Sequence, residues 1–486
     1  MDINKLNKNV FTTLIVYLLL LLSVRQVQAE PSPISVPINS SQSGQNSNPC
    51  DFWDGINHSS QMFGDLCGMR TLLARYGMTL GIQETSEVLG NVTGGSQRGF
   101  DYDGLTQATL QLDTQHAFNW YGGTFNVSGL QVHGDNLSAE NLGSLQTASG
   151  IEADRGARLW ELWYDQKFLD EDKLDIKIGQ QSLDQEFMVS SNALLFVNTM
   201  FGWPLVPSDD LPGGGPAYPL SDLGVRAQWK MPIDSVKILA GVFNGSPIRN
   251  NNAADSQRAD RWGTSFPLDG GVLAIAELQY SYPAIGAMSY GDESPLSGTY
   301  RLGAWYDSEQ FADQRYDNTG VSLADSDTNV ARLHNGDYSI YGVADQMIMR
   351  SSTDPNRNLS TFLRVMGTPE TDRNLVDFSL NFGFNLTDPL PYRTDDTFGI
   401  GMGYARVSNY AVGLGEDYVD IGTFTPQGRG ETFLEATYQY QLYPWMQLQP
   451  DVQYVMNPGG GIVNPSNTTR TIKNEWVIGI RAVIQI

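Results

Sequence analysis

Hydrophobic and polar residues alternate along sixteen short segments of this chain, and the last segment shows the pattern best. From Trp476 to Ile486 every second residue is apolar, and the residues between them include Arg481 and Gln485. Successive side chains of a β-strand point to opposite faces, so this segment predicts a strand with one oily face and one wetter face. Many such segments in one exported chain are typical of a transmembrane β-barrel.

The connections between these segments tend to alternate in length. Tight turns at 169–173 and 443–445 alternate with long polar or Gly/Pro-rich stretches such as 184–222 and 308–335. Short turns at one end and long loops at the other are the rule for outer-membrane barrels, and about sixteen strands enclose a water-filled lumen. We therefore predict an all-β fold, an antiparallel transmembrane barrel. Its strands are expected near 79–89, 105–116, 124–133, 158–168, 174–183, 223–231, 236–243, 271–282, 298–307, 336–348, 358–367, 374–386, 397–407, 431–442, 446–455 and 474–486.

The first residues have the features of an export signal. Lys5 and Lys8 precede a mostly apolar run over residues 10–22, and Ala29 suits a small-residue cleavage site. A retained membrane anchor is the alternative, but the run is short for a bilayer span, which needs about 20 residues. We therefore predict a signal peptide over residues 1–29.

Two further segments precede the barrel, which we place at 79–486. Residues 30–62 are rich in proline and serine, which predicts a disordered periplasmic lead-in. Residues 63–78 predict a short periplasmic helix, with Asp65 as its N-cap and Gly77 as its stop. Its apolar residues lie near one stripe, which we expect to pack at the periplasmic mouth of the barrel.

Charge and cysteine content narrow the range of functions. The formal net charge is −24, which argues against nucleic acid as a partner and against a channel for anionic substrates. The histidines are scattered without metal-ligand spacing, so we expect no metal, no other cofactor and no catalytic site. Cys50 and Cys67 lie close together in an exported chain, which predicts a disulfide; two free, buried thiols are the alternative.

Several motifs, taken in their order and spacing, resemble the carbohydrate-selective porins, the glucose-porin family of Gram-negative outer membranes. The resemblance runs from about Phe63 to Ile486. It implies a sixteen-stranded barrel in the outer membrane that lets sugars diffuse passively, without enzymatic activity. The motifs are GVRAQWK (224–230), GVFNGSP (241–247), TYRLGAWYDS (299–308), DDTFGIGMGYARVS (395–408) and ETFLEATYQYQLYPWMQLQPDVQYVMNPGGG (431–461).

Two places depart from the family pattern. The family usually reads Gly-Asp-Trp-Gly-Gly where this chain has Gly-Asp-Leu-Cys-Gly over residues 64–68. The family usually ends on an aromatic residue, whereas this chain ends on Ile486. The final strand nevertheless keeps its alternation.

The alternation also assigns side chains to the lumen. In 298–307, Leu302 and Ala304 face lipid if the apolar positions point outward, so Arg301 and Trp305 face inward. Carboxylates accept hydrogen bonds from sugar hydroxyls, guanidinium groups donate them, and indole rings stack on the sugar ring. The alternative is that these residues are polar only because the lumen contains water, and that they have no role in sugar binding. The candidate sugar-contacting residues are Glu161, Trp163, Arg226, Glu277, Arg301, Trp305, Arg364, Glu435 and Arg481.

One long connection, 184–222, is unusually aromatic for a solvated loop. It contains Phe187, Phe196, Phe201 and Trp203. It also resembles a segment of the porin family that begins Glu-Phe and ends Phe-Gly. We expect it to fold into the channel and narrow it; packing among loops at the outer rim is the alternative.

Three other functions are weighed against a sugar channel. The acidity of the chain would also suit a general cation-preferring diffusion porin. An outer-membrane barrel enzyme would need a histidine at the membrane rim, and His116 and His133 lie at strand ends, but no Ser/His/Asp motif surrounds them in the sequence. A structural or adhesive surface protein is the third. The expected partners are sugars and outer-membrane lipid, and the pattern leaves a monomer and a homotrimer equally open.

Overall fold

The computed structural model describes residues 59–486, apart from 234, 250–254, 284–294, 326, 328–329, 355 and 424–427. The expected signal peptide and nearly all of the expected lead-in lie outside the described residues, so both stay predictions. Cys50 also lies outside them.

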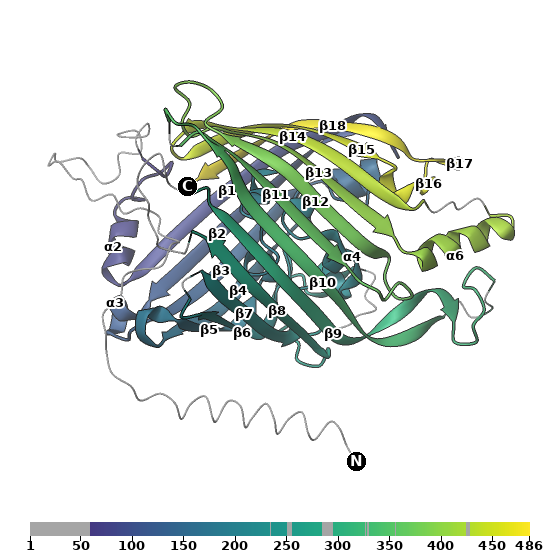
Figure 1. The fold of residues 1–486 in the computed structure, drawn as a ribbon, viewed down its shortest axis with the longest axis horizontal. Helices are drawn as coiled ribbons and strands as arrows, with labels where there is room; N and C mark the ends of the chain where they lie inside the picture. Colours follow the sequence, from purple (N-terminus) through teal and green to yellow (C-terminus); the bar gives the residue numbers. More distant parts are fainter. Residues whose placement is uncertain are drawn as a thin grey trace, which may run out of the picture.

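The described chain forms one closed barrel of sixteen antiparallel strands (Figure 1). The strands are β1 (Met78–Gly95), β2 (Gly99–Asp113), β3 (Gly123–Gly134), β4 (Gly156–Phe168), β5 (Leu174–Gln181), β6 (Asp222–Lys230), β7 (Val236–Asn244), β8 (Val272–Tyr282), β9 (Gly298–Asp317), β10 (Ala331–Arg350), β11 (Asn358–Gly367), β12 (Val376–Thr387), β13 (Thr397–Val407), β14 (Gly430–Tyr443), β15 (Met446–Met456) and β18 (Lys473–Gln485). β1 pairs with β18, which closes the cylinder. The predicted fold class is confirmed.

Several strands, β1 among them, are longer than predicted, and the neighbouring strands β9 and β10 lengthen at the same end. β9 continues to Asp317 and β10 begins at Ala331, so the pair projects beyond the rest of the long-loop end of the barrel in Figure 1. The added residues of β9 are largely polar, and Phe311, Asp313 and Asp317 among them are buried. The backbone ladder continues there through two register shifts.

Shorter elements lie in the connections. The long-loop end carries α5 (Ser256–Ala259), α6 (Asn409–Asp420) and a small hairpin that was not predicted, β16 (Val463–Asn464) with β17 (Asn467–Thr471). The opposite end carries α2 (Met69–Arg75) and α3 (Thr114–Phe118). α4 (Leu205–Asp210) belongs to the β5–β6 connection. Single turns of 3₁₀ or π type lie at Ser138–Leu142, Asp170–Asp172, Leu183–Gln185, Ala193–Leu195, Thr199–Phe201, Pro212–Gly214 and Pro458–Gly460.

The N-terminal helix is present but shorter than predicted, and its details differ. Gly68 occupies the N-cap position, and Asp65 instead accepts hydrogen bonds from the backbone N–H and the hydroxyl of Thr71. Gly77 has φ 73°, the left-handed conformation of a C-terminal stop, as expected. The apolar stripe packs only in part, because Leu66 and Leu73 are half-buried whereas Met69 and Tyr76 are 42% and 61% exposed.

The N-terminal segment holds the end of the chain. The Arg70 guanidinium of α2 donates hydrogen bonds to the backbone carbonyls of Leu80 and Ile486. The Met62 N–H donates to the Gln485 carbonyl at 2.7 Å. Both termini of the described chain therefore meet at the short-turn end, in agreement with an even number of strands.

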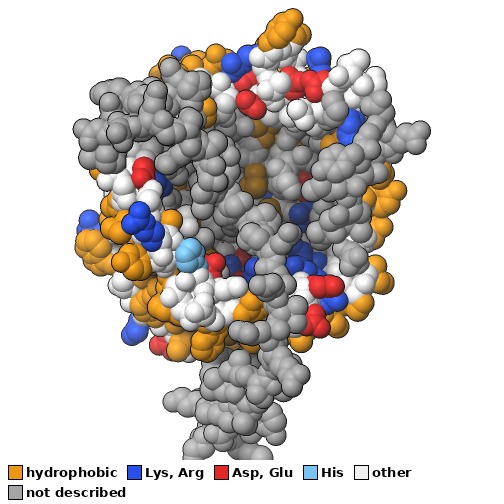
Figure 2. Space-filling view, turned by 90° about the vertical axis from the view of Figure 1, so that its left-hand side faces the viewer, with side chains coloured by type: hydrophobic (Ala, Val, Ile, Leu, Met, Phe, Trp, Pro, Cys, Tyr) orange, Lys and Arg blue, Asp and Glu red, His pale blue; other side chains and the backbone are white. Residues whose placement is uncertain are grey.

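The wall of the barrel has two chemically different faces. Exposed apolar side chains such as Leu302, Tyr306 and Ile400 alternate with buried polar ones such as Asp307. Figure 2, which views the end near α2, shows hydrophobic side chains around the outside and charged ones within the hollow. Within the described residues, no helix is long and apolar enough to cross a membrane.

We predict that Cys50 and Cys67 are joined in the mature protein. Alkylation of the purified protein without reductant, followed by mass spectrometry, should leave both residues unmodified, and alkylation after reduction should modify both. Labelling of both residues before reduction would show free thiols.

Candidate functional site

The connection between β5 and β6, residues 182–221, lies inside the barrel, and we call it the inner loop. Its aromatic residues Phe187, Phe196 and Phe201 are buried in one hydrophobic cluster with wall residues that include Phe362 and Phe433. The ring centroids of Phe196 and Phe201 are 4.4 Å apart, and Phe201 meets Phe433 edge-on at 5.2 Å. The aromatic side chains that are unusual for a solvated loop therefore form the core of this segment.

Bare backbone on the facing wall makes room for these rings. β13 reads Gly399-Ile-Gly401-Met-Gly403, so its glycines all point inward while its apolar residues point outward. A Cβ atom on Gly401 would come within 2.7 Å of the Phe201 ring and 3.0 Å of the Phe196 ring. The glycine alternation of this strand is thus required by the close approach of the inner loop.

Carboxylates of the wall hold the backbone of the inner loop. Glu277 accepts a hydrogen bond from Met188 N at 2.8 Å. Glu435 accepts two, from Val197 N at 2.6 Å and Asn198 N at 3.1 Å. Hydrogen bonds from backbone N–H groups to a carboxylate are among the stronger ones in proteins, so the loop is fixed at several points along its length.

Arg364 of β11, a cation, also holds the inner loop. Its side chain is 1% exposed and donates to the carbonyl oxygens of Met188 at 3.0 Å and Gly202 at 2.8 Å, and to that of Met200. Asn381 accepts from the same guanidinium at 3.0 and 3.1 Å. Three loop carbonyls thus depend on one buried side chain.

Basic side chains form a strip on the lumen face of β5, β6, β7 and β9. Lys177 and Arg226 are cross-strand partners, and Lys237 and Arg301 flank Gln279 in the register. Neighbouring strands lie about 5 Å apart, so these groups converge on one side of the lumen.

The arginines of this strip are paired with carboxylates. Arg301 Nη1 lies 2.8 Å from Asp345 Oδ2, and its Nε lies 4.0 Å from Glu277 Oε1. Arg226 Nε lies 3.2 Å from Glu186 Oε2 of the inner loop. Asp345 also accepts from the Ser190 hydroxyl of the loop at 2.6 Å, so it joins the strip to the loop.

All nine candidate residues point inward, and the structure places them in different surroundings. Glu277, Arg301 and Arg226 belong to the strip and its anchors. Lys177 Nζ stands 4.3 Å above the Trp163 ring, and Glu161 accepts from Ser182 N at 3.2 Å. Arg364 and Glu435 hold the inner loop. Arg481 bonds Glu87 at 2.7 Å and Ser149 at 3.0 Å on the far side of the lumen.

Trp305 requires a correction. Its side chain points inward as predicted, but it is 2% exposed and belongs to the hydrophobic cluster under the inner loop. A ring that is covered in this way offers no face for a sugar to stack on, so the expected stacking contact is not supported here.

The family assignment follows from comparison with known proteins. The model of the carbohydrate-selective porin, OprB family, matches residues 97–486. This chain belongs to that family. As a carbohydrate-selective porin, it forms a barrel in the Gram-negative outer membrane through which carbohydrates diffuse passively.

Individual relatives are distant in sequence but similar over most of their length. Porin B of Pseudomonas aeruginosa is 25% identical over 427 residues, covering 83% of this porin and 88% of that protein. A putative porin, QuiX, of Acinetobacter baylyi is 22% identical over 467 residues, covering 88% and 93%. The high-pH structure of Pseudomonas putida OprB has a TM-score of 0.75 at 22% identity, covering 88% and 99%. That structural likeness concerns the fold.

Sequence reasoning missed two residues of the porin's charged strip, Lys177 and Lys237, and one carboxylate that pairs with the strip, Asp345. Lys177 follows the same alternation that located Arg301, because Ile176 and Ile178 face outward. The alternation in that strand could therefore have identified it. Lys237 could have been found in the same way. Asp345 lies at an inward position of β10 between the apolar residues Val343 and Met347.

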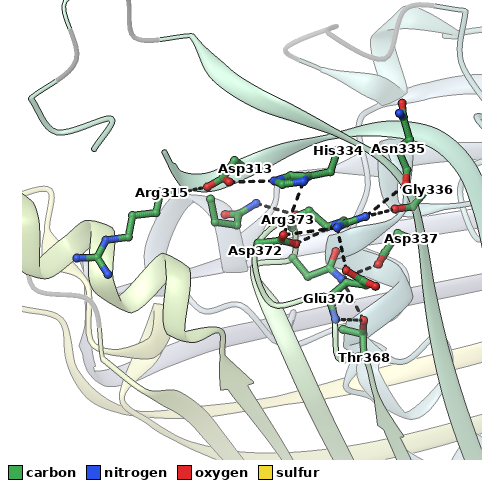
Figure 3. A network of polar contacts seen from close by, with 12 residues as sticks. Asp313, Arg315, His334, Asn335, Gly336, Asp337, Thr368, Glu370, Asp372 and Arg373 are labelled. Carbon is green, nitrogen blue, oxygen red and sulfur yellow. Dashed lines mark hydrogen bonds and ion pairs between the residues drawn. The ribbon is translucent and has the colours of Figure 1, made fainter. Parts of the chain in front are cut away.

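A second polar network lies at the extracellular end of the porin (Figure 3). His334 of β10 lies between two carboxylates, with Nε2 2.9 Å from Asp313 Oδ2 and Nδ1 3.6 Å from Asp372 Oδ2. Arg373 pairs with Asp372 at 2.9 Å and with Glu370 at 2.8 Å. These contacts tie the projecting part of β9 and β10 to the short β11–β12 connection.

The network extends to α6 through Arg315, and its stability should depend on pH. Hydrogen bonds from Arg315, at 2.7 and 2.8 Å, lower the pKa of Asp417, and the Ser322 hydroxyl adds to this effect. A lowered carboxyl pKa stabilises the folded contact above the unfolded pKa, near 4, and this stabilisation is lost as pH falls through the folded value. We expect α6 and residues 313–323 to lose hydrogen-exchange protection, corrected for intrinsic rates, below about pH 4.

The Asp417→Asn variant is the control for this prediction, because it removes the titrating group. Its protection should be lower at neutral pH and should change little with acid. Equal protection of the wild-type α6 at pH values above and below this range would contradict the prediction.

Proposed function

We propose that the inner loop sets the size limit of this porin and that sugars cross the narrow region along the charged strip of Lys177, Arg226, Lys237 and Arg301. The observation that carries the proposal is the pairing of Arg226 and Arg301 with carboxylates of the wall and of the loop. Sugar hydroxyls both donate and accept hydrogen bonds, so a strip with adjacent donors and acceptors suits a neutral polar solute.

The same pairing disfavours a free ion as the preferred solute. Because Arg301 lies beside Asp345 and near Glu277, neither sign of charge dominates that part of the lumen. A general cation-preferring porin would instead leave the acidic groups of the narrow region without basic partners. The two functions therefore differ in how ion current responds to sugar.

The first test is Arg301→Ala. We expect reversible block of ion current by neutral mono- or oligosaccharides to weaken by about tenfold, the loss expected for one or two hydrogen bonds from a charged group. Asp345 would lose its cation, so the pore should also become more cation-selective. Planar-bilayer recordings with sugar titration and reversal potentials measure both effects.

The control variant is Arg393→Ala, which removes an arginine paired with Asp396 in the turn between β12 and β13. Its sugar block and selectivity should match the wild type. If wild-type current is indifferent to every sugar tested, the porin is a general diffusion pore and the proposal is wrong.

A further inference from the structure

Two carboxylates lie directly opposite each other on the lumen face of β9 and β10. Asp307 and Asp337 are partners in the register of the two strands, and both side chains are fully buried. Side chains in such positions have their Cβ atoms about 4.5–5.5 Å apart, and like charges directly opposite each other destabilise a sheet. We call these two residues the acidic pair, and its repulsion requires a partner that offsets it.

Hydrogen bonds satisfy only one oxygen of each carboxylate. Asp307 Oδ1 accepts from Glu309 N at 2.8 Å, and Asp337 Oδ1 accepts from Asn374 Nδ2 at 2.9 Å. Within the described part of the chain, Oδ2 of each carboxylate is buried without a hydrogen-bond donor. Leaving a charged oxygen buried and unpaired is costly, so both oxygens call for a ligand.

The acidic pair also lacks a basic partner. In the ranges that the structure describes, no lysine or arginine lies within ion-pair distance of Asp307 or Asp337. The charge of Arg373 reaches Asp337, but the Arg373 guanidinium is ion-paired with Asp372 and Glu370. This arrangement differs from the charged strip, where the carboxylates Asp345 and Glu186 have arginine partners.

Two further oxygens beside the pair have no donor. The hydrogen bond to Asp337 fixes the orientation of the Asn374 amide, and Asn374 Oδ1 is left buried and unpaired among the described residues. Asp210, the last residue of α4 in the inner loop, lies close enough to Asp337 to repel it, and its Oδ2 is likewise buried and unpaired. Unpaired oxygens from the wall and from the inner loop are thus gathered in one place.

A ligand set made only of oxygens, with an excess of negative charge, suits Ca²⁺. This ion takes about six to eight carboxylate, amide, carbonyl and water oxygens at about 2.3–2.6 Å, so two oxygens on one ion can lie up to about 5 Å apart. That span agrees with the spacing of the acidic pair. A shared proton would join only two of the four oxygens and would leave Asn374 Oδ1 unsatisfied.

The protein ligands must include a neutral oxygen. Among the described residues, no group of three or more His, Cys, Asp or Glu side chains is arranged to hold a metal ion. The two carboxylates of the acidic pair and the amide oxygen of Asn374 form a set that agrees with this finding. Asp210 then acts through water, since bridging waters join polar groups that do not touch.

We propose that Asp307, Asp337 and Asn374 bind a calcium ion on the lumen wall, and that Asp210 attaches the end of α4 to this ion through water. The ion neutralises the repulsion within the acidic pair and fastens the inner loop to β9 and β10. The inference does not depend on the proposed sugar path, because no residue of the charged strip takes part.

Calcium titration of the purified full-length porin tests the site. Calorimetry on chelator-treated protein in detergent should show one saturable site per chain. Asp307→Asn and Asp337→Asn should each weaken it by about tenfold or more, because each removes a charged ligand. Heat-modifiable mobility on a gel shows that each barrel is folded.

The matched control is Asp396→Asn, which removes a buried carboxylate that already has an arginine partner, Arg393. Its calcium affinity should equal that of the wild type. A wild type that binds no calcium, or an affinity that Asp337→Asn leaves unchanged, would overturn the proposal.

Hydrogen exchange at neutral pH distinguishes calcium from a shared proton. A ligand that binds only the folded contact stabilises it, so calcium should slow exchange in residues 205–210 of the wild type. The same residues of Asp337→Asn should show no response. If a proton satisfied the acidic pair, exchange in the wild type would change with pH but not with calcium, and the proposal would be wrong.

Discussion

Replacing Arg364 with methionine is expected to release the inner loop and to raise the single-channel conductance several-fold. Methionine fills a similar length but donates no hydrogen bond, so the carbonyls of Met188, Met200 and Gly202 lose their shared donor. Each unpaired buried carbonyl costs about 1–3 kcal/mol, which is enough in sum to detach a loop that is held at a few points. Sugar block should disappear together with the narrow region.

Planar-bilayer conductance measures this effect, and heat-modifiable mobility on a gel shows that the barrel itself is folded. Arg406→Met is the matched control, because Arg406 is an arginine of the same wall whose side chain is 53% exposed and pairs with Asp377. Its conductance should equal that of the wild type. An unchanged conductance of folded Arg364→Met would mean that the loop is held without this residue.

The second large effect is expected from Gly401→Leu. Even the Cβ of the new side chain would lie 2.7 Å from the Phe201 ring, so the Phe196–Phe201 pair must move away from β13. Overpacking of this kind costs about 1–3 kcal/mol, and displacing the loop relieves it more easily than deforming the barrel. We expect a larger conductance and a weaker sugar block than in the wild type.

Gly81→Leu is the control for this prediction, because a Cβ on Gly81 meets nothing within 4 Å. This variant should conduct like the wild type. If Gly401→Leu conducts less than the wild type, the new side chain narrows the pore and the inner loop has stayed in place.

The alternation of side chains predicted the wall of the barrel closely because one face of it contacts lipid and the other contacts water. The segments 358–367 and 397–407 agree with β11 and β13 to the residue. The alternation was not recognised in the outer parts of β9 and β10, because the buried positions of β9 there include Asp313 and Asp317 and the contrast between an apolar and a polar face is lost. Backbone pairing and the polar contacts of His334 and Arg315 hold these parts, and neither produces an alternating pattern in the sequence.

The sequence predicted which way the candidate side chains point but not what each of them does. The alternation correctly placed Arg301, Trp305 and Glu435 on the lumen face. Whether such a residue meets solute or supports a loop depends on where residues 182–221 fold, and that position results from contacts between segments far apart in sequence. Trp305 is covered and Glu435 binds the loop backbone for this reason.

The contact between Glu84 and His133 on the outer face of the barrel, with His133 Nε2 3.5 Å from Glu84 Oε1, was beyond sequence reasoning for a related reason. Glu84 and His133 come from β1 and β3, and only the register of β2 between them brings them together. A search for nearby Ser, His and Asp residues in the sequence finds no such cluster. The register of a barrel depends on all its turns at once, so no single segment reveals it.

The bond between Arg70 and the final carbonyl has a consequence for how the barrel is completed. The two residues are separated by 416 positions, and β1 can pair with β18 only after the last strand has been synthesised. Until that pairing forms, the outer edge of β1 stays open. Because Arg70 bonds both Leu80 of β1 and Ile486 beside β18, α2 seals the seam between the first and last strands. Deleting Ile486 alone would remove the acceptor for this seal while leaving all sixteen strands nearly complete.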